Sequence, residues 1–587
     1  MPKSTYRVSL LLVLAAQQLL AGCSSAPKAT ESDSQMAVLA EDPLPSMTED
    51  DPEPVYAELS RETLYELLVA EMAGKQNRLD IALGNYMRQA HLTQDPKVIR
   101  RYATIAAYMQ AHQATSDATE LWLKVEPANP DALHLALADA LRSGEAETMR
   151  NAWQALLSQT SKLDTGFLSE AVASSSRDAK KSARKVLTEL LKDDHWQDNF
   201  QLWYISAQLN ANLGASEQAL ANLNRVQKIE RDFVPGLVLA AGLYEQQKDA
   251  QSLLKTLKRL SSLQPQNKKI RIYYVRALVQ TDHLRKAENE IMDLIALFPK
   301  DHDIKLTAAV INAELKEFET AAALLNEVIT AEHRQNEAYL QLGIIAELQE
   351  LPIKARKLYE QVTPGTGFQD AQLRIAQLYV NADQFEAALK QLETAIERQP
   401  KSALVLQVSI AELLSEQGQA DRALAHLDKA LEPDPEVVPL LYARAMIAET
   451  QDKFAQFEQD LRKILELDAD NAAALNALGY TYANRNIHLD EARELVERAH
   501  EIAPDDAAIL DSLGWTYYRL GDLSAAEDYL ARAYDELKDA EVAAHYGEVL
   551  WQLDKQRQAK KVWRKALQEH PKAQILQETL KRFKVEL

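Results

Sequence analysis

Residues 472–504 read AAALNALGYTYANRNIHLDEARELVERAHEIAP, and residues 507–537 read AAILDSLGWTYYRLGDLSAAEDYLARAYDEL. Both contain the pattern Leu-x-x-Leu-Gly-x-x-Tyr, which starts at Leu475 in the first and 35 residues later, at Leu510, in the second. The apolar positions recur with helical spacing, so each segment predicts two antiparallel helices joined by a short turn. Gly479 and Gly514, with Ala492 and Ala526 in the second helices, are small enough to let the two helices of a pair approach closely.

This pattern resembles the tetratricopeptide repeat (TPR), a helix pair that recurs about every 34 residues. The position of Ala492 can be followed through eleven units at intervals of 33 to 35 residues, and the markers are Ala219, Leu253, Ala287, Ala321, Ala355, Ala388, Ala423, Phe457, Ala492, Ala526 and Ala559. The resemblance therefore implies an all-α TPR superhelical solenoid of about eleven regular repeats, preceded by irregular helical hairpins. Leu253 and Phe457 break the small-residue rule, so we expect local repacking in those two pairs.

The composition agrees with a helical solenoid. At 587 residues the chain is too long for one core, yet it holds only 16 glycines and 20 prolines, which leaves few signals for turns and sheets. A repeat array reconciles this length with a uniform composition, because each unit packs only on its neighbours. The net charge of -21 argues against nucleic-acid binding, which needs a basic surface.

The N-terminus predicts a bacterial lipoprotein signal over residues 1–22. Lys3 and Arg7 precede a mostly apolar run over residues 8–20, which is too short to span a bilayer comfortably. The sequence Leu-Ala-Gly-Cys that ends at Cys23 resembles the lipobox of bacterial lipoproteins, and Cys23 is the only cysteine in the chain. The resemblance implies lipidation of Cys23 and, with Ser24 following it, anchoring in the outer membrane on its periplasmic face. An ordinary secretory signal is the alternative.

Composition divides the remainder of the chain into four parts. Residues 23–60 form an acidic, proline-rich linker with nine acidic residues and five prolines, a composition that cannot bury enough apolar surface to fold. Residues 61–199 predict degenerate TPR-like hairpins, residues 200–572 the eleven-repeat array, and residues 573–587 a capping helix for the end of the solenoid.

No catalytic or metal-binding constellation emerges from the sequence. The single cysteine excludes a cysteine-rich zinc site, and the histidines are scattered without a ligand spacing. No serine has a convincing histidine and aspartate partner, and no glycine-rich loop follows a strand. We therefore expect a protein that is not an enzyme and that has no cofactor and no metal.

A groove is the remaining candidate site. In TPR proteins the first helix of each pair lines the concave face, and aromatic side chains with polar tips are frequent anchors of protein interfaces. Applied to the C-terminal repeats, this resemblance selects Tyr442, Met446, Asn476, Tyr480, Asp511, Trp515, Tyr518, Arg519 and Trp551. The alternative is that some of these residues fill the interior of a tight superhelix.

The combination of a lipobox, an acidic tether, irregular hairpins and about eleven repeats resembles the outer-membrane lipoprotein adaptor of pseudomonads. That resemblance implies a non-catalytic scaffold that binds and activates a periplasmic carboxyl-terminal processing serine protease. It also implies peptidoglycan hydrolases as the substrates that the scaffold presents. The alternative is a TPR lipoprotein that assembles an envelope export machine, for polysaccharide secretion or for a pilus.

Overall fold

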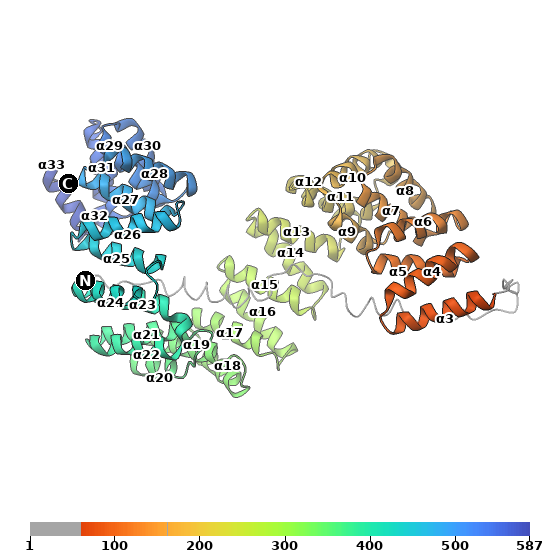
Figure 1. The fold of residues 1–587 in the computed structure, drawn as a ribbon, viewed down its shortest axis with the longest axis horizontal. Helices are drawn as coiled ribbons and strands as arrows, with labels where there is room; N and C mark the ends of the chain where they lie inside the picture. Colours follow the sequence, from red (N-terminus) through yellow and green to blue (C-terminus); the bar gives the residue numbers. More distant parts are fainter. Residues whose placement is uncertain (1–59, 161–162) are drawn as a thin grey trace. The chain divides into compact units, whose positions relative to one another are not determined.

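A computed structural model describes residues 60–160 and 163–587, and all regular structure in these residues is helical (Figure 1). The chain forms two compact units, divided between Glu327 and Val328 within α18 (Phe318–Thr330). In each unit consecutive helices pack as antiparallel hairpins, and each hairpin stacks on the next (Figure 1). The predicted all-α TPR solenoid is thus confirmed.

The helices of unit 1 before α18 are α3 (Arg61–Lys75), α4 (Leu79–Thr93), α5 (Pro96–Tyr108), α6 (His112–Val125), α7 (Pro130–Ser143), α8 (Ala146–Gln159), α9 (Thr165–Ser174), α10 (Arg177–Leu190), η1 (Asp194–Trp196), α11 (Phe200–Asn212), α12 (Ser216–Ile229), α13 (Val234–Gln246), α14 (Ala250–Leu263), α15 (Lys268–Gln280), α16 (Leu284–Leu297) and α17 (His302–Glu314). The helices of unit 2 after α18 are α19 (Gln335–Leu348), α20 (Pro352–Tyr359), α21 (Phe368–Asn381), α22 (Phe385–Arg398), η2 (Pro400–Ser402), α23 (Ala403–Glu416), α24 (Ala420–Leu431), α25 (Val438–Thr450), α26 (Phe454–Leu467), α27 (Ala472–Arg485), α28 (Leu489–Ile502), α29 (Ala507–Leu520), α30 (Leu523–Glu536), α31 (Ala540–Gln552), α32 (Gln556–Glu569) and α33 (Gln574–Phe583).

The eleven marker positions all lie on the second helix of a hairpin, from α12 to α32, and none is more than 4% exposed. The nine alanines among them are fully buried, because a larger side chain would separate the paired helices. Leu253 and Phe457 are also buried, and the Phe457 ring stacks on Phe454 with centroids 6.0 Å apart. These two hairpins therefore fill the position with a larger apolar side chain.

Two glycines of the quoted stretch lie where a side chain would not fit. A Cβ atom added to Gly479 would lie 2.7 Å from Cγ1 of Val496, and one added to Gly514 would lie 2.6 Å from Cγ of Leu530. The predicted close approach of the paired helices is confirmed at both positions.

Besides His488, which directly precedes α28, each of the eleven hairpins has one residue with a positive φ within two residues of the end of its first helix. These residues are Gly214, Lys248, Asp282, Lys316, Glu350, Asp383, Gly418, Asp452, Asn486, Gly521 and Asp554. Helices commonly end on such a left-handed residue, because its backbone N–H can close the last turn. Many helix starts are capped as well: the Asp506 carboxylate accepts bonds from the backbone N–H groups of Ala508 and Ile509 at 2.9 and 3.2 Å.

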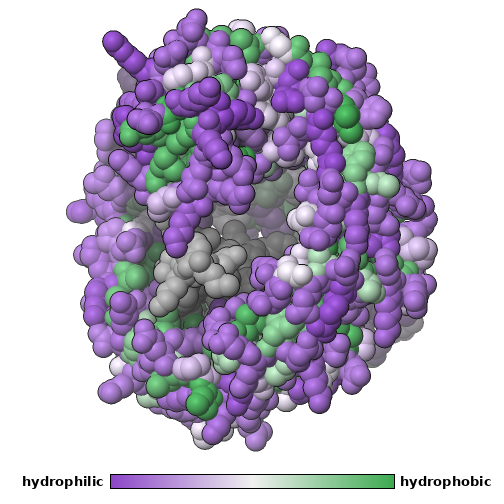
Figure 2. Space-filling model, turned by 90° about the vertical axis from the view of Figure 1, so that its left-hand side faces the viewer, coloured by the Kyte–Doolittle hydropathy of each residue, from purple (hydrophilic) through white to green (hydrophobic). Residues whose placement is uncertain are grey.

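The surface in Figure 2 is mainly hydrophilic, and its hydrophobic residues are gathered in small separate patches. In residues 60–160 and 163–587, no helix is both long and apolar enough to cross a membrane. The predicted lipidation site, Cys23, lies outside the described residues, as do the predicted signal over residues 1–22 and nearly all of the linker.

Candidate protein-binding site

Three first helices of unit 2, α27, α29 and α31, and the terminal helix α33 carry a connected cluster of aromatic and charged side chains. At its centre Nδ1 of His545 lies 3.0 and 3.1 Å from the two carboxylate oxygens of Asp511. Both side chains are buried. Burial by itself would lower the pKa of His545, but the carboxylates of Asp511, Glu541 and Glu548 outweigh it and raise this pKa above its ordinary value.

Aromatic rings surround this pair. The Trp515 ring stacks on the His545 ring with centroids 4.0 Å apart and an interplanar angle of 21°. The Tyr518 ring lies 5.0 Å from the Trp515 ring, and the Arg519 guanidinium lies 5.9 Å from the Trp515 ring. The imidazole is therefore held between a carboxylate and an indole face.

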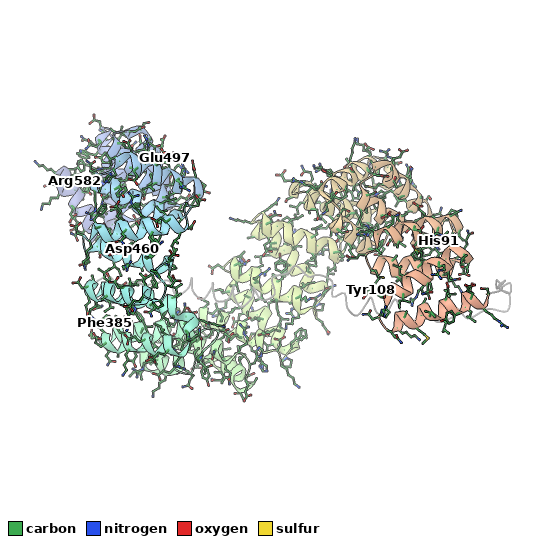
Figure 3. All side chains as sticks on the ribbon, in the orientation of Figure 1. His91, Tyr108, Phe385, Asp460, Glu497 and Arg582 are labelled. Carbon is green, nitrogen blue, oxygen red and sulfur yellow. The ribbon has the colours of Figure 1, made fainter. Side chains whose placement is uncertain are left out.

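Two tyrosines fix the position of carboxylates on α31. The Tyr480 hydroxyl donates to Oε1 of Glu541 at 2.5 Å, and the Tyr518 hydroxyl donates to Oε1 of Glu548 at 3.0 Å. Burial, followed by the nearby Glu548, raises the pKa of Tyr518 to about 12, and burial and Glu541 raise the pKa of Tyr480 further. Arg582 of α33 forms an ion pair with Glu548 and closes the cluster at the C-terminal end of unit 2 (Figure 3).

The bond from Tyr480 to Glu541 joins two first helices that are not neighbours. Tyr480 belongs to the hairpin α27–α28 and Glu541 to α31, with the hairpin α29–α30 between them. In this part of unit 2 the first helices therefore curve so tightly that side chains two repeats apart meet on the inner face.

Three polar atoms at this face are buried without a hydrogen-bond partner in the described part of the chain: Oδ1 of Asn476, Nε1 of Trp515 and Nε of Arg519. Buried polar groups in proteins are nearly always hydrogen-bonded, so a set of unpaired groups needs an explanation. Because none of the three atoms has appreciable accessible surface, they lie inside the packing of this face, and a bound segment can pair with them only if neighbouring side chains move.

The structure separates the nine predicted groove residues into three sets. Tyr480, Asp511, Trp515, Tyr518 and Arg519 meet in the cluster, and Asn476 lies on α27 at the repeat position that Asp511 occupies on α29. Tyr442 and Met446 lie half-buried on α25.

One part of the groove prediction needs correction. Trp515 is 3% exposed and Asp511 is 6% exposed, so these two side chains contribute mainly to the interior that they share with His545. The tight curvature causes this, and the interior-filling alternative holds for them. Trp551 packs against Trp563 and Phe583, at centroid distances of 5.7 and 6.2 Å, and is half-buried like Tyr480 and Tyr518. Partner binding by the remaining residues stays a prediction.

Sequence reasoning missed His545, Glu541 and Arg582 as members of the cluster. A signal for His545 was present, because it follows Asp511 by 34 residues and therefore occupies the same repeat position. Glu541 and Arg582 carried no comparable signal, because their contacts depend on the curvature of the array and on the path of the terminal helix.

The sequence matches a family model described as tetratricopeptide repeat over residues 373–435 and 408–472. The chain belongs to the TPR repeat-containing proteins, since a relative of that description aligns with most of its length. This relative is TPR repeat-containing protein PA4667 of Pseudomonas aeruginosa, which is 36% identical over 493 residues, or 84% of this chain and 83% of the relative.

Three solved helical-repeat structures are similar at low scores. The Cut9–Hcn1 hetero-tetramer of the APC/C matches with a TM-score of 0.29 and 13% identity, covering 84% of this chain and 97% of the other. Naa15/Naa10 bound to HypK-THB matches with a TM-score of 0.36 and 12% identity, covering 87% of this chain and 93% of the other. Yeast Tom70 matches with a TM-score of 0.34 and 12% identity, covering 89% of this chain and 94% of the other. Scores this low indicate nothing about the partners of this chain.

Proteins built from TPR arrays are scaffolds for protein–protein interaction, and the matches indicate no catalytic family. The class of this protein is therefore an interaction scaffold.

Proposed function

We propose that the chain is a lipid-anchored adaptor on the periplasmic face of the outer membrane. In this proposal, the signal over residues 1–22 is removed, Cys23 is lipidated, and the acidic linker tethers the solenoid to the membrane. The solenoid binds and activates a carboxyl-terminal processing protease and presents peptidoglycan hydrolases to it. Two proteins held on one scaffold meet at a raised effective concentration without any chemistry by the scaffold itself.

The observation that carries this proposal is the cluster on the inner face of unit 2. Tyr480 and Tyr518 are half-buried there, and so are Asn476 and Arg519, so aromatic and polar groups are partly accessible together, which suits binding of a protein segment. The exposed carboxylate of Glu541 adds negative charge at the same place, so a segment with a basic side chain fits best. The relationship to the Pseudomonas protein over 84% of the chain supports a shared architecture.

A reconstituted degradation assay tests the proposal. A purified carboxyl-terminal processing protease and a peptidoglycan hydrolase are mixed with and without this chain, and loss of the hydrolase is followed over time. We expect rapid loss only with the chain present. The double variant Asn476→Ala/Arg519→Ala should slow this loss about tenfold or more, the effect of removing one or two good interface contacts.

A matched variant controls for general damage. Asn484 and Arg498 are exposed on α27 and α28, so Asn484→Ala/Arg498→Ala removes the same residue types away from the inner face and should retain full activity. Crosslinked pull-downs from detergent-solubilised envelopes separate the alternative function. Recovery of export-pore subunits without a protease would favour the export-machine assembly role.

A further inference from the structure

Two outer helices of this acidic chain carry the same run of positive charge. Residues 177–187 of α10 read RDAKKSARKVL, and residues 557–567 of α32 read RQAKKVWRKAL. Seven of the eleven positions are identical, including all five basic ones, although the segments lie 380 residues apart and in different units. We call the five basic side chains of each segment a cationic face; they are Arg177, Lys180, Lys181, Arg184 and Lys185 on α10, and Arg557, Lys560, Lys561, Arg564 and Lys565 on α32.

Helical geometry puts the five cations of each segment on one side. At 100° per residue they fall within an arc of about 140°. The opposite side of α32 is buried through Ala559, Trp563 and Ala566, and that of α10 through Ala179 and Ala183. The cations therefore lie on the solvent side of each helix, as exposed or half-buried side chains.

Few counter-charges meet these faces. Within the described residues, no ion pair involves any of the five cations of α32, and Lys560 only approaches the carbonyl oxygen of Glu586 at 3.5 Å. On α10 a single pair forms, between Lys181 and Asp178 at 2.9 Å. Residues 555–587 contain ten basic and three acidic side chains, whereas the whole chain contains 66 basic and 87 acidic side chains.

The stability of the helices does not explain this pattern. Like charges three and four residues apart repel each other, and both faces contain several such spacings, such as Lys561 with Lys565. Arg177 and Arg557 lie in the first turn of their helices, where the helix dipole disfavours a positive charge. Other outer helices of the array mix both signs: Arg493 of α28 lies 4.0 Å from both Asp490 and Glu497.

We propose that both cationic faces dock the protein onto an anionic phospholipid bilayer. Surface lysines and arginines gain free energy near anionic headgroups without any insertion, which suits faces whose apolar residues already pack into the solenoid. A bilayer offers the same anionic chemistry at two separate places, as the duplicated sequence requires. An acidic peptide with a single acidic run, such as the linker of this chain, could pair with only one of the two cationic faces at a time. This proposal is independent of any partner protein.

Vesicle co-sedimentation tests the inference with the full mature chain carrying Cys23→Ser, so that no lipid anchor contributes. Each cation near an anionic surface contributes about fivefold to partitioning. We expect binding to vesicles of mixed phosphatidylglycerol and phosphatidylcholine, little binding to phosphatidylcholine alone, and loss of binding at high salt. Changing the five cations of α32 to glutamine should reduce partitioning at least tenfold. The same change on α10 should reduce it too, but less, because Asp178 already offsets one charge.

A charge-matched control makes the test specific. Five dispersed exposed lysines, changed to glutamine, alter the net charge equally; they are Lys300, Lys316, Lys354, Lys357 and Lys401. This variant should keep its partitioning within about twofold, and circular dichroism should show all variants folded. An equal loss in the control, or equal binding to phosphatidylcholine alone, would overturn the proposal. The proposal would also be overturned if a synthetic peptide of residues 24–59 bound to both cationic faces of the protein and vesicles did not bind to the protein.

Discussion

The variant Gly514→Ala tests why a glycine stands at this position. The close contact between helices, and not the conformational freedom of the backbone, is the reason we expect. The added Cβ atom would lie 2.6 Å from Cγ of Leu530, 3.1 Å from its backbone nitrogen and 3.2 Å from the carbonyl oxygen of Ala526. Ordinary carbon contacts begin at about 3.5 Å. Because two of the three atoms belong to the backbone of α30, a rotation of the Leu530 side chain alone cannot relieve the contact.

The expected magnitude is a difference of two opposing effects. Alanine stabilises a helix interior by about 1 kcal/mol relative to glycine. Overpacking a tight contact costs about 1–3 kcal/mol, and a contact that displaces a helix backbone belongs at the upper end. The net destabilisation of the hairpin α29–α30 should therefore be about 1–2 kcal/mol, which corresponds to about a 5- to 30-fold change in the equilibrium of opening.

Hydrogen exchange followed by mass spectrometry is the suitable assay, because a repeat array does not unfold in one step and local opening must be read locally. Peptides from α29 and α30 should lose about 5- to 30-fold in protection. Gly242→Ala is the matched control, since Gly242 lies within α13 and its added Cβ atom meets nothing within 4 Å. That variant should gain protection. If Gly514→Ala gained it as well, close helix approach would not be the reason for this glycine.

Three further substitutions probe buried or half-buried titratable groups, and a fourth serves as a surface control. The pKa of His545 in the folded chain lies above its unfolded value of about 6.5, so the stability that the protonated imidazole adds is complete below pH 6.5 and is lost as pH rises through the folded pKa. His545→Gln should remove this loss of stability in thermal melts between pH 6 and 9. An unchanged slope of melting temperature against pH would contradict the assignment. Burial raises the pKa of Glu314 to about 7, so the folded chain loses stability as pH rises from about 4.3 through 7. Glu314→Gln should therefore stabilise unit 1 by about 1 kcal/mol at pH 8. An equal gain in stability at pH 5 would contradict the raised pKa of Glu314. Asp460 is 2% exposed and accepts two bonds from Arg444, so Asp460→Ala should cost about 3 kcal/mol in denaturant unfolding. Asp428 pairs with the same arginine at the surface, and Asp428→Ala should cost under about 1 kcal/mol, so equal losses would refute the role of burial.

The repeat array could be predicted from the sequence because its packing depends on small residues at fixed intervals. Ala492, Ala526 and Gly514 lie where a larger side chain would push the paired helices apart. The recurrence of small residues at these positions therefore marks in the sequence where two helices pack closely. The turns between paired helices could not be read in this way. Eight of the eleven positive-φ residues are lysine, aspartate, glutamate or asparagine rather than glycine, and nothing in the sequence distinguishes them from other polar loop residues.

The candidate site could be predicted only in part, for a different reason. The repeat register identifies which side chains of a first helix face inward, and Tyr480, Asp511 and Trp515 do meet there. Register does not determine how tightly successive repeats curve. That curvature decides that Trp515 is buried while Tyr480 reaches Glu541, and it arises from the packing of many side chains at once.

The hydrogen bond between Tyr480 and Glu541 has a consequence for how the protein unfolds. In a solenoid whose repeats contact only their neighbours, the end can fray one repeat at a time. A bond that skips a repeat, together with the ion pair from Arg582 to Glu548, ties α27, α31 and α33 to one another. The last repeats of unit 2 should therefore open as one cooperative block, so the free end of the array resists fraying and proteolysis better than its terminal position suggests.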